Sequence, residues 1–260
     1  MKIRTKKVKF ASRDSLKLHG TFTSPSGPVR GALLMVHGIT SDRDEWGIFE
    51  KVADELAHSG LASLRFDYRG HGESVLDEDK ISLHGILSDI LSAWGLLESR
   101  TEPAPKSFRR YIMGSSFGGG LAYAAAAQMG NIDRAFLLAP VFDYLIDIEN
   151  CAPRWQGDLK RKDQIRYNHL RLGRALVNEA FYFDPLAGAD VATTIFHGTL
   201  DTDVRIELSE KVAARLRKIE LIRMEGAGHV LNVPDDFDLE QAESWVFVDR
   251  MIDLVRKRIR

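Results

Sequence analysis

Short apolar runs alternate with amphipathic helical stretches along almost the whole chain, and this alternation constrains the fold more than any other feature. Eight strand-like runs occur, at Val8–Ala11, Leu16–Thr23, Gly31–Val36, Leu61–Phe66, Tyr111–Met113, Ala135–Ala139, Thr193–His197 and Leu221–Met224. The run Gly31–Val36 contains no polar side chain, as expected of a strand buried on both faces of a parallel sheet. Repeated strand–helix–strand units predict an α/β fold with a mostly parallel, eight-stranded sheet and helices on both faces.

Helices are predicted where apolar residues recur at helical spacing or where alanine dominates. These stretches are Trp46–Ser59, Leu83–Glu98, Leu121–Gln128, Ile206–Leu216 and Leu239–Arg260. The turn-prone residues Ser12–Ser15 join the first two strand-like runs and predict an antiparallel opening hairpin. One helix-prone stretch, 141–184, breaks the alternation and is too long for a simple connection. We expect it to be an insertion within a single domain spanning 1–260.

Composition excludes several classes of protein. The chain has 36 Lys and Arg against 37 Asp and Glu, and this balance argues against a nucleic-acid binder that acts through a basic surface. The single cysteine, Cys151, excludes internal disulfides, and no His, Asp or Glu spacing predicts a metal site. No apolar run approaches the roughly 18 residues that span a bilayer. The basic start Met1–Lys7 lacks the apolar stretch of a signal peptide, so we expect a soluble cytoplasmic protein.

The sequence Gly114-Ser-Ser-Phe-Gly118 matches the pattern G-x-S-x-G. The pattern alone is weak evidence, but here it follows an apolar strand and precedes a predicted helix. In that setting a strained turn exposes the central serine, Ser116, above the sheet. The two glycines are expected because a Cβ at either position would collide across so tight a turn. The backbone N–H of Phe117, at the start of the helix, is then a candidate donor to an oxyanion.

A serine hydroxyl is a weak nucleophile and needs a base that is oriented by a carboxylate. His229 directly follows the last predicted strand, and Asp201 follows the strand before it. Together with Ser116, both lie just past the carboxyl ends of parallel strands, where open α/β sheets place ligands. We therefore expect these three side chains to converge as a Ser-His-Asp triad. Asp203 is the rival for the acid.

Five segments, distributed over nearly the whole chain, resemble the motifs of one superfamily. They are His37-Gly-Ile-Thr40, Asp67-Tyr-Arg-Gly-His-Gly-Glu-Ser74, the segment around Ser116, His197-Gly-Thr-Leu-Asp-Thr-Asp-Val204 and Gly228-His229. The chain resembles the α/β-hydrolases, and among them small-cap bacterial carboxylesterases such as cinnamoyl (feruloyl) esterases and monoacylglycerol-lipase-like enzymes. The resemblance implies the α/β-hydrolase fold, with 141–184 as a small helical cap that sets specificity.

The resemblance also implies roles for individual residues. The family pattern places the acid three residues before a valine, which selects Asp201 over Asp203 because Val204 follows. It implies that the N–H of Ile39 is the second oxyanion donor. It further implies that His37 and Gly38 shape the loop that carries this donor. The seven basic residues between Arg154 and Arg174 favour either an anionic substrate or, in our preferred interpretation, a solvated helix face.

These observations predict a serine carboxylic-ester hydrolase that forms an acyl-enzyme on small acyl or aryl esters and needs no cofactor. An acyl-thioesterase, a monoacylglycerol lipase or a serine aminopeptidase would use the same triad. Epoxide hydrolases and haloalkane dehalogenases are disfavoured because those relatives carry Asp at the position of Ser116. A ligand receptor on this fold is also disfavoured, because such receptors often lose a triad member. The sequence leaves open the acyl specificity and the oligomeric state, for which a homodimer is one option.

Overall fold

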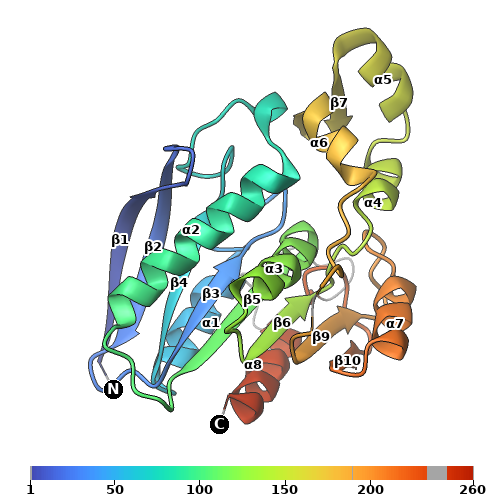
Figure 1. The fold of residues 1–260 in the computed structure, drawn as a ribbon. Helices are drawn as coiled ribbons and strands as arrows, with labels where there is room; N and C mark the ends of the chain where they lie inside the picture. The colour runs from blue at the N-terminus through green and yellow to red at the C-terminus, as the bar shows by residue number, and fades with distance from the viewer. Residues whose placement is uncertain (1, 189, 233–244, 260) are drawn as a thin grey trace.

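An eight-stranded sheet forms the centre of the protein in the computed structural model, which describes residues 2–188, 190–232 and 245–259. Its strands are β1 (Ile3–Ala11), β2 (Lys17–Pro25), β3 (Gly31–Val36), β4 (Leu61–Asp67), β5 (Arg109–Ser115), β6 (Arg134–Leu138), β9 (Thr193–Gly198) and β10 (Ile219–Met224). They lie in the order β1-β2-β4-β3-β5-β6-β9-β10 (Figure 1). The pairs β1–β2 and β2–β4 are antiparallel, and all pairs from β4 to β10 are parallel. The predicted opening hairpin and mostly parallel sheet are confirmed.

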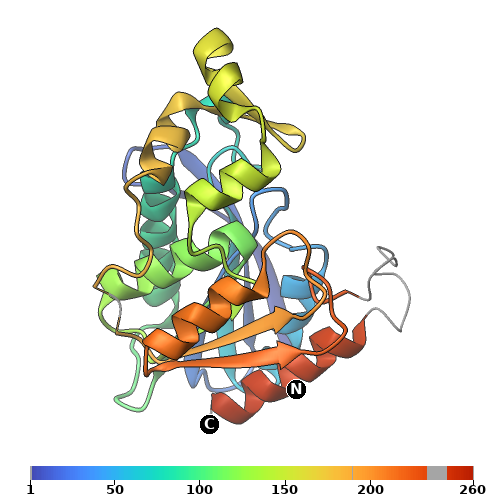
Figure 2. The same ribbon diagram turned by 90° about the vertical axis from the view of Figure 1, so that its right-hand side faces the viewer.

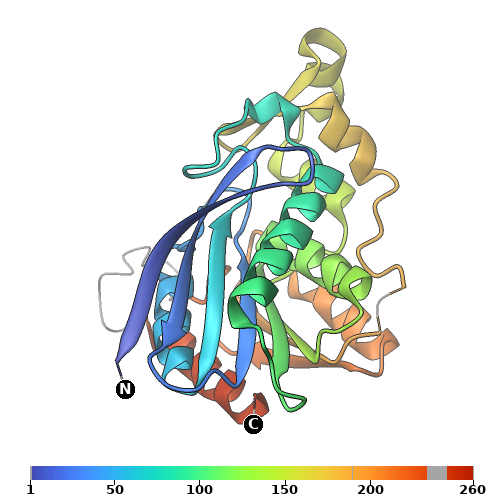
Figure 3. The ribbon, with the colours of Figure 1, turned by 60° about the vertical axis from the view of Figure 1, so that its left-hand side comes forward.

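Helices cover both faces of the sheet (Figures 1 and 3). They are α1 (Ile48–Ala57) and α8 (Val246–Arg258) on one face, and α2 (Leu83–Thr101), α3 (Ser116–Met129) and α7 (Ile206–Arg215) on the other. Along β3, Leu33 and Met35 pack into the core shared with α1 and α8, whereas Leu34 and Val36 pack into the core shared with α2 and α3. The strand is therefore buried on both faces, which explains why its sequence shows no polar alternation.

Two helices differ most in extent from the prediction. The helix expected to begin at Leu121 begins at Ser116, although glycine costs about 1 kcal/mol in a helix and this turn contains three. Close packing accounts for the glycines, since a Cβ on Gly120 would lie 2.0 Å from the carbonyl oxygen of Val141. The last helix spans Val246–Arg258, and the part expected over 239–244 lies outside the described residues.

Between β6 and β9 the chain leaves the sheet and forms a separate layer. This layer contains α4 (Tyr144–Cys151), α5 (Trp155–Lys162), the hairpin β7 (Gln164–Tyr167) and β8 (Leu170–Gly173), and α6 (Arg174–Ala180). Figures 1 and 2 show it at one end of the molecule, with α4 nearest the sheet and α5 farthest. The hairpin was not predicted, and it rests on the short helix η1 (Glu78–Lys80), where the N–H of Arg171 donates to Glu78 Oε2 at 2.8 Å.

Candidate active site

Ser116 lies at the turn where β5 ends and α3 begins. Its φ of +51° is in the left-handed region, which a residue with a side chain adopts only when the surrounding structure holds it there. A Cβ on Gly118 would lie 2.1 Å from the carbonyl oxygen of His37, and one on Gly114 would lie 2.6 Å from the Cβ of Ala122. This crowding explains why both motif positions are glycine. The turn matches the strained strand-to-helix geometry that the sequence motif predicts.

Asp201 and His229 follow the neighbouring parallel strands β9 and β10. The Nδ1 atom of His229 lies 2.8 Å from Asp201 Oδ2, and its Nε2 atom lies 2.9 Å from the hydroxyl oxygen of Ser116. The side chain of Asp201 is fully buried, whereas that of His229 is 17% exposed. The structure therefore brings the three predicted side chains into one hydrogen-bonded line, with its histidine accessible from outside.

The charges in this line stabilise each other. Burial alone would raise the pKa of Asp201, but hydrogen bonds from His197 and His229 and from the N–H of Val204 hold that pKa well below its usual range. Burial lowers the pKa of His229. The hydrogen bond and charge of Asp201, reinforced by Asp203, outweigh this effect and raise the pKa of His229 above its usual value. The site therefore holds Asp201 as a carboxylate and favours a protonated imidazole.

Several groups orient the carboxylate of Asp201. The N–H groups of Asp203 and Val204 both donate to its Oδ1 at 2.9 Å. The side chain of His197 lies 3.2 Å from Oδ2, and this histidine also contacts the hydroxyl of Ser209 and the carbonyl of Val204. Asp203 is exposed and contributes a backbone donor, so it is Asp201 that faces the imidazole. The contact of His197 was not foreseen from the sequence.

Phe117 directly follows Ser116, and the loop that contains Ile39 passes close to Ser116. Gly38, which precedes Ile39, comes so close that a Cβ built on it would lie 3.4 Å from the Cβ of Ser116. Within the described part of the chain, neither N–H has a hydrogen-bond acceptor. Their carbonyls are anchored instead, because Tyr144 donates to the carbonyl of Phe117 at 2.8 Å and His71 Nε2 lies 2.5 Å from that of Ile39. Two free donors next to the serine are what an oxyanion requires.

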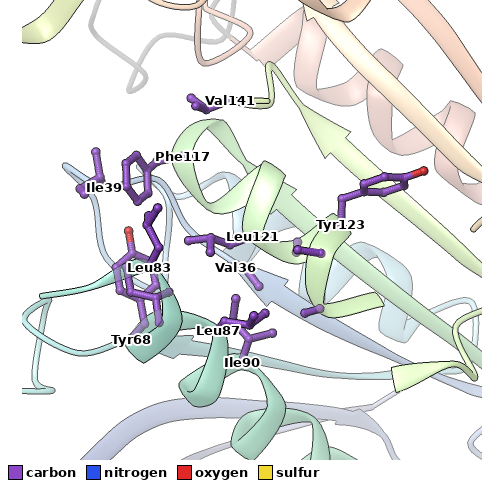
Figure 4. Packing of buried hydrophobic residues seen from close by; sticks show 14 of the residues in the cluster. Val36, Ile39, Tyr68, Leu83, Leu87, Ile90, Phe117, Leu121, Tyr123 and Val141 are labelled. Carbon is purple, nitrogen blue, oxygen red and sulfur yellow. The ribbon is translucent and has the colours of Figure 1, made fainter. Parts of the chain in front are cut away.

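His37 packs under this loop. Its ring stacks on Tyr68 with centroids 3.9 Å apart, and its Nδ1 lies 2.7 Å from the carbonyl oxygen of Gly38. Burial lowers the pKa of His37 well below its usual value, so the ring is neutral. Figure 4 shows the ring of Tyr68 below Ile39 and Phe117, with its hydroxyl directed toward them. The packing supports the loop that carries the Ile39 N–H.

Two buried carboxyls near the triad were missed by the sequence analysis. Glu45, in the loop before α1, is only 1% exposed and accepts the N–H of Gly38 at 2.8 Å. Asp147, in α4, is 6% exposed and accepts the hydroxyl of Tyr167 at 2.6 Å. Burial raises the pKa of Asp147 to about 6, and the charge of His229 moderates this shift, so Asp147 lies within electrostatic reach of the triad. No periodic pattern marks either residue, because their burial depends on tertiary packing.

Within the described residues, no group of three or more His, Cys, Asp or Glu side chains is arranged to hold a metal ion. The same residues contain no helix that combines the length and apolar character needed to cross a membrane.

Solved structures share this fold over nearly their whole length. The chain is similar to Est1E from Butyrivibrio proteoclasticus, solved with ferulic acid bound, at a TM-score of 0.79 and 21% identity, covering 97% of this chain and 99% of that one. It is similar to the α/β hydrolase GrgF from Penicillium sp. at a TM-score of 0.70 and 17% identity, covering 98% and 99%. The esterase Pf2001 of Pyrococcus furiosus matches at a TM-score of 0.69 and 20% identity, covering 98% and 90%. These similarities show that the chain has the α/β-hydrolase fold.

Residues 27–179 match the family model described as serine aminopeptidase, S33, and the chain belongs to that family. It is 26% identical over 229 residues to an uncharacterized protein of Mycobacterium tuberculosis, covering 87% of this chain and 72% of that one. It is 30% identical over 109 residues to an uncharacterized 31.7 kDa protein of Escherichia coli. That match covers 42% of this chain and 37% of the relative, so less than two thirds of the relative's length is spanned.

Proposed function

We propose that the protein is a serine carboxylic-ester hydrolase in which Ser116 is the nucleophile, His229 the general base and Asp201 the orienting carboxylate. The observation that carries the proposal is the position of the His229 imidazole, 2.9 Å from the Ser116 hydroxyl and 2.8 Å from the Asp201 carboxylate. A base within this distance of the proton it removes, oriented by a third group, is the arrangement that nucleophilic catalysis by serine needs.

The reaction would proceed in two halves. Ser116 Oγ attacks the ester carbonyl carbon while His229 Nε2 takes the hydroxyl proton, and the N–H groups of Ile39 and Phe117 bind the oxygen that becomes negative. The carbon–oxygen bond to the alcohol then breaks, and His229 returns the proton to the leaving alcohol. Water, deprotonated by His229, attacks the acyl-enzyme, and the acid is released as Ser116 regains its proton. No step needs a cofactor.

The segment 141–184 would select the acyl group. Tyr167, from β7, packs its ring near Phe117 with centroids 6.4 Å apart, and its hydroxyl is bonded to Asp147. A binding site that opened beside these buried aromatic rings and this polar pair would suit an aromatic acid that carries a hydroxyl group. The bound ferulic acid in Est1E is an acid of that chemistry. We therefore propose small aryl esters as the preferred substrates, with hydroxycinnamates first among them.

A serine aminopeptidase is the second candidate, because the family description names that activity. Asp147, Asp203 and Glu45 give the surroundings of His229 a negative character, which would attract the free ammonium group of a peptide's first residue. The cytoplasmic location expected from the sequence stays a prediction, and the oligomeric state stays open, with a homodimer as one option.

A labelling experiment tests the catalytic assignment. A fluorophosphonate probe should attach to Ser116, as read by peptide mass spectrometry, and the Ser116→Ala variant should remain unlabelled and should not hydrolyse p-nitrophenyl acetate. Multiple turnover by the unmodified protein separates an enzyme from a receptor that reacts once. A folded Ser116→Ala variant with activity near wild type would reject the nucleophile.

A substrate panel tests the substrate class. It comprises methyl ferulate, methyl cinnamate, an acyl thioester and an aminoacyl p-nitroanilide. We expect the highest kcat/KM for methyl ferulate, and we expect Asp147→Asn to reduce its advantage over methyl cinnamate. A preference for the anilide would favour the aminopeptidase, and a preference for the thioester would favour a thioesterase.

A further inference from the structure

Glu45 is a buried acid that the reaction above does not use. It lies in the loop between β3 and α1, and its φ is +46°, followed by +56° at Trp46 and +84° at Gly47. Three consecutive left-handed residues, two of them with side chains, form a backbone that persists only where surrounding contacts enforce it. The position of Glu45 is therefore fixed by its contacts with the surrounding structure.

The carboxylate of Glu45 joins two segments of the site. Its Oε2 accepts the N–H of Gly38 at 2.8 Å, and Gly38 directly precedes Ile39. The hydroxyls of Ser115, directly before Ser116, and of Ser41 lie near the same side chain and lower its pKa. One buried group therefore holds the loop that contains Ile39 and lies beside the turn that contains Phe117.

Gly38 lies between the Glu45 carboxylate and the Ser116 side chain and is close to both. A Cβ built on Gly38 would lie 3.4 Å from Glu45 Oε1 and also 3.4 Å from the Cβ of Ser116. Because the Glu45 carboxylate accepts the N–H of Gly38, a displaced Glu45 side chain would release Gly38 beside the serine. Because an oxyanion donor acts only when its N–H is aimed at the developing charge, a small shift of this kind would reduce catalysis.

We propose that Glu45 is a positioning residue, whose carboxylate fixes the Ile39 N–H relative to the Phe117 N–H by holding the Gly38 N–H beside Ser116. This rests on the proposed serine-hydrolase function and deepens it. Glu45 touches no substrate atom in this role. Its removal should therefore lower kcat, where the oxyanion forms, and leave KM nearly unchanged.

Electrostatics supply a second readout. Burial raises the pKa of Glu45, and the N–H of Gly38, the two serine hydroxyls and the charge of His229 oppose this shift. Among the described residues, Asp201 and Asp203 after β9 and Glu45 itself raise the pKa of His229, and Asp147 in α4 is a further carboxyl within electrostatic reach. A negative Glu45 stabilises the protonated imidazole. Loss of its charge should therefore shift the acid limb of the pH–rate profile to lower pH.

The test compares Glu45→Gln and Glu45→Ala with Glu50→Gln, a neighbouring acid in α1 whose side chain is 61% exposed. Glutamine keeps an acceptor for the Gly38 N–H and removes the charge, whereas alanine removes both. With p-nitrophenyl acetate we expect kcat to fall about 10-fold in Glu45→Gln and about 100-fold in Glu45→Ala, near the loss caused by one missing oxyanion donor. KM should stay within threefold, and Glu50→Gln should match wild type.

A trifluoromethyl ketone, which forms an anionic adduct with the serine, should bind the two Glu45 variants more weakly in proportion to their loss of kcat/KM. The acid limb of Glu45→Gln should lie at lower pH than that of wild type. If Glu45→Ala does not fold, Glu45→Gln decides alone. The proposal is overturned if Glu45→Gln keeps wild-type kcat, if its loss appears only in KM, or if its acid limb does not move. An inactive wild type would instead refute the esterase function, which Ser116→Ala tests separately.

Discussion

The Nε2 atom of His229 lies 2.9 Å from the hydroxyl oxygen of Ser116, although 113 positions separate the two residues in the chain. The distance depends on two independent turns, one that exposes the serine after β5 and one that returns the histidine after β10. Both turns follow parallel strands of one sheet, so the sheet itself sets the separation of the two side chains. The alignment of the two side chains is thus a property of the whole sheet.

Asp201→Asn should lower kcat for p-nitrophenyl acetate by about 10³ to 10⁴-fold. The amide cannot hold the tautomer in which His229 presents an unprotonated Nε2 to Ser116, and it cannot stabilise the imidazolium that forms. Asp203→Asn is the matched control two residues away, because the contribution of Asp203 to Asp201 is a backbone N–H that the substitution retains. Steady-state kinetics of the two variants decide the matter, and comparable losses in both would contradict the assignment of the acid.

The acid limb of kcat/KM should have its midpoint above 6.5, the ordinary pKa of histidine. His229 must be neutral to accept the proton of Ser116, and Asp201 and the other nearby carboxylates raise its pKa despite its burial. Activity should therefore increase as pH rises through this raised pKa. Initial rates at low substrate concentration between pH 5 and 9 measure the midpoint. A value below 6.5 would show that burial outweighs the carboxylates.

Asp147→Asn should change how stability depends on pH. The pKa of Asp147 is raised to about 6 in the folded protein, chiefly by burial, from 3.8 when exposed. A group whose pKa is raised on folding contributes stability that is complete below its unfolded pKa and is lost as pH rises through its folded pKa. This loss amounts to roughly 3 kcal/mol for a shift of about two units.

Since asparagine does not titrate, the variant should be stabilised relative to wild type as pH rises from 4.5 to 7.5. Urea denaturation at these two pH values measures the difference. Asp163→Asn, at an exposed position of the same segment, is the control and should follow the wild-type pH dependence. An unchanged pH dependence in Asp147→Asn would show that Asp147 is not titrating in this range.

Gly118→Ala should destabilise the protein by at least about 2 kcal/mol and abolish activity. The added methyl would lie 2.1 Å from the carbonyl oxygen of His37 and 2.8 Å from that of Val36, and backbone atoms cannot move aside as a flexible side chain would. Gly95→Ala is the opposite case, because no atom lies within 4 Å of its added methyl in the middle of α2. That variant should be stabilised by up to about 1 kcal/mol, since alanine favours a helix. Thermal and urea unfolding of both variants would test the contrast.

The order of elements could be predicted from the sequence because periodicity reports directly on burial. β3 is the clearest example, since its uninterrupted apolar sequence corresponds to a strand covered on both sides. The hairpin β7–β8 could not be predicted, since its strands are four residues long and are stabilised by contact with η1. The start of α3 was also missed, because propensity opposes glycine where close packing requires it.

The candidate triad could be predicted because Ser116, Asp201 and His229 each lie shortly after the end of a strand, and parallel strands end at one edge. Glu45 had no such signal. Its side chain is buried by the way its loop folds back on Gly38, and nothing in the linear pattern distinguishes it from the exposed acids nearby. The sequence pattern therefore reveals functional side chains whose positions are set by the sheet. It does not reveal those whose positions are set by the folding of a loop.

The chain leaves the sheet after β6 and returns at β9, and these two strands pair directly with each other. The points where the chain leaves and rejoins the sheet are therefore adjacent. A layer of different length and composition could replace the intervening layer, and the order of the strands and the pairing of β6 with β9 would stay the same. Interchange of this layer between homologous proteins would be a route to new selectivity, because the proton-transfer groups reside on the portions of chain that stay behind.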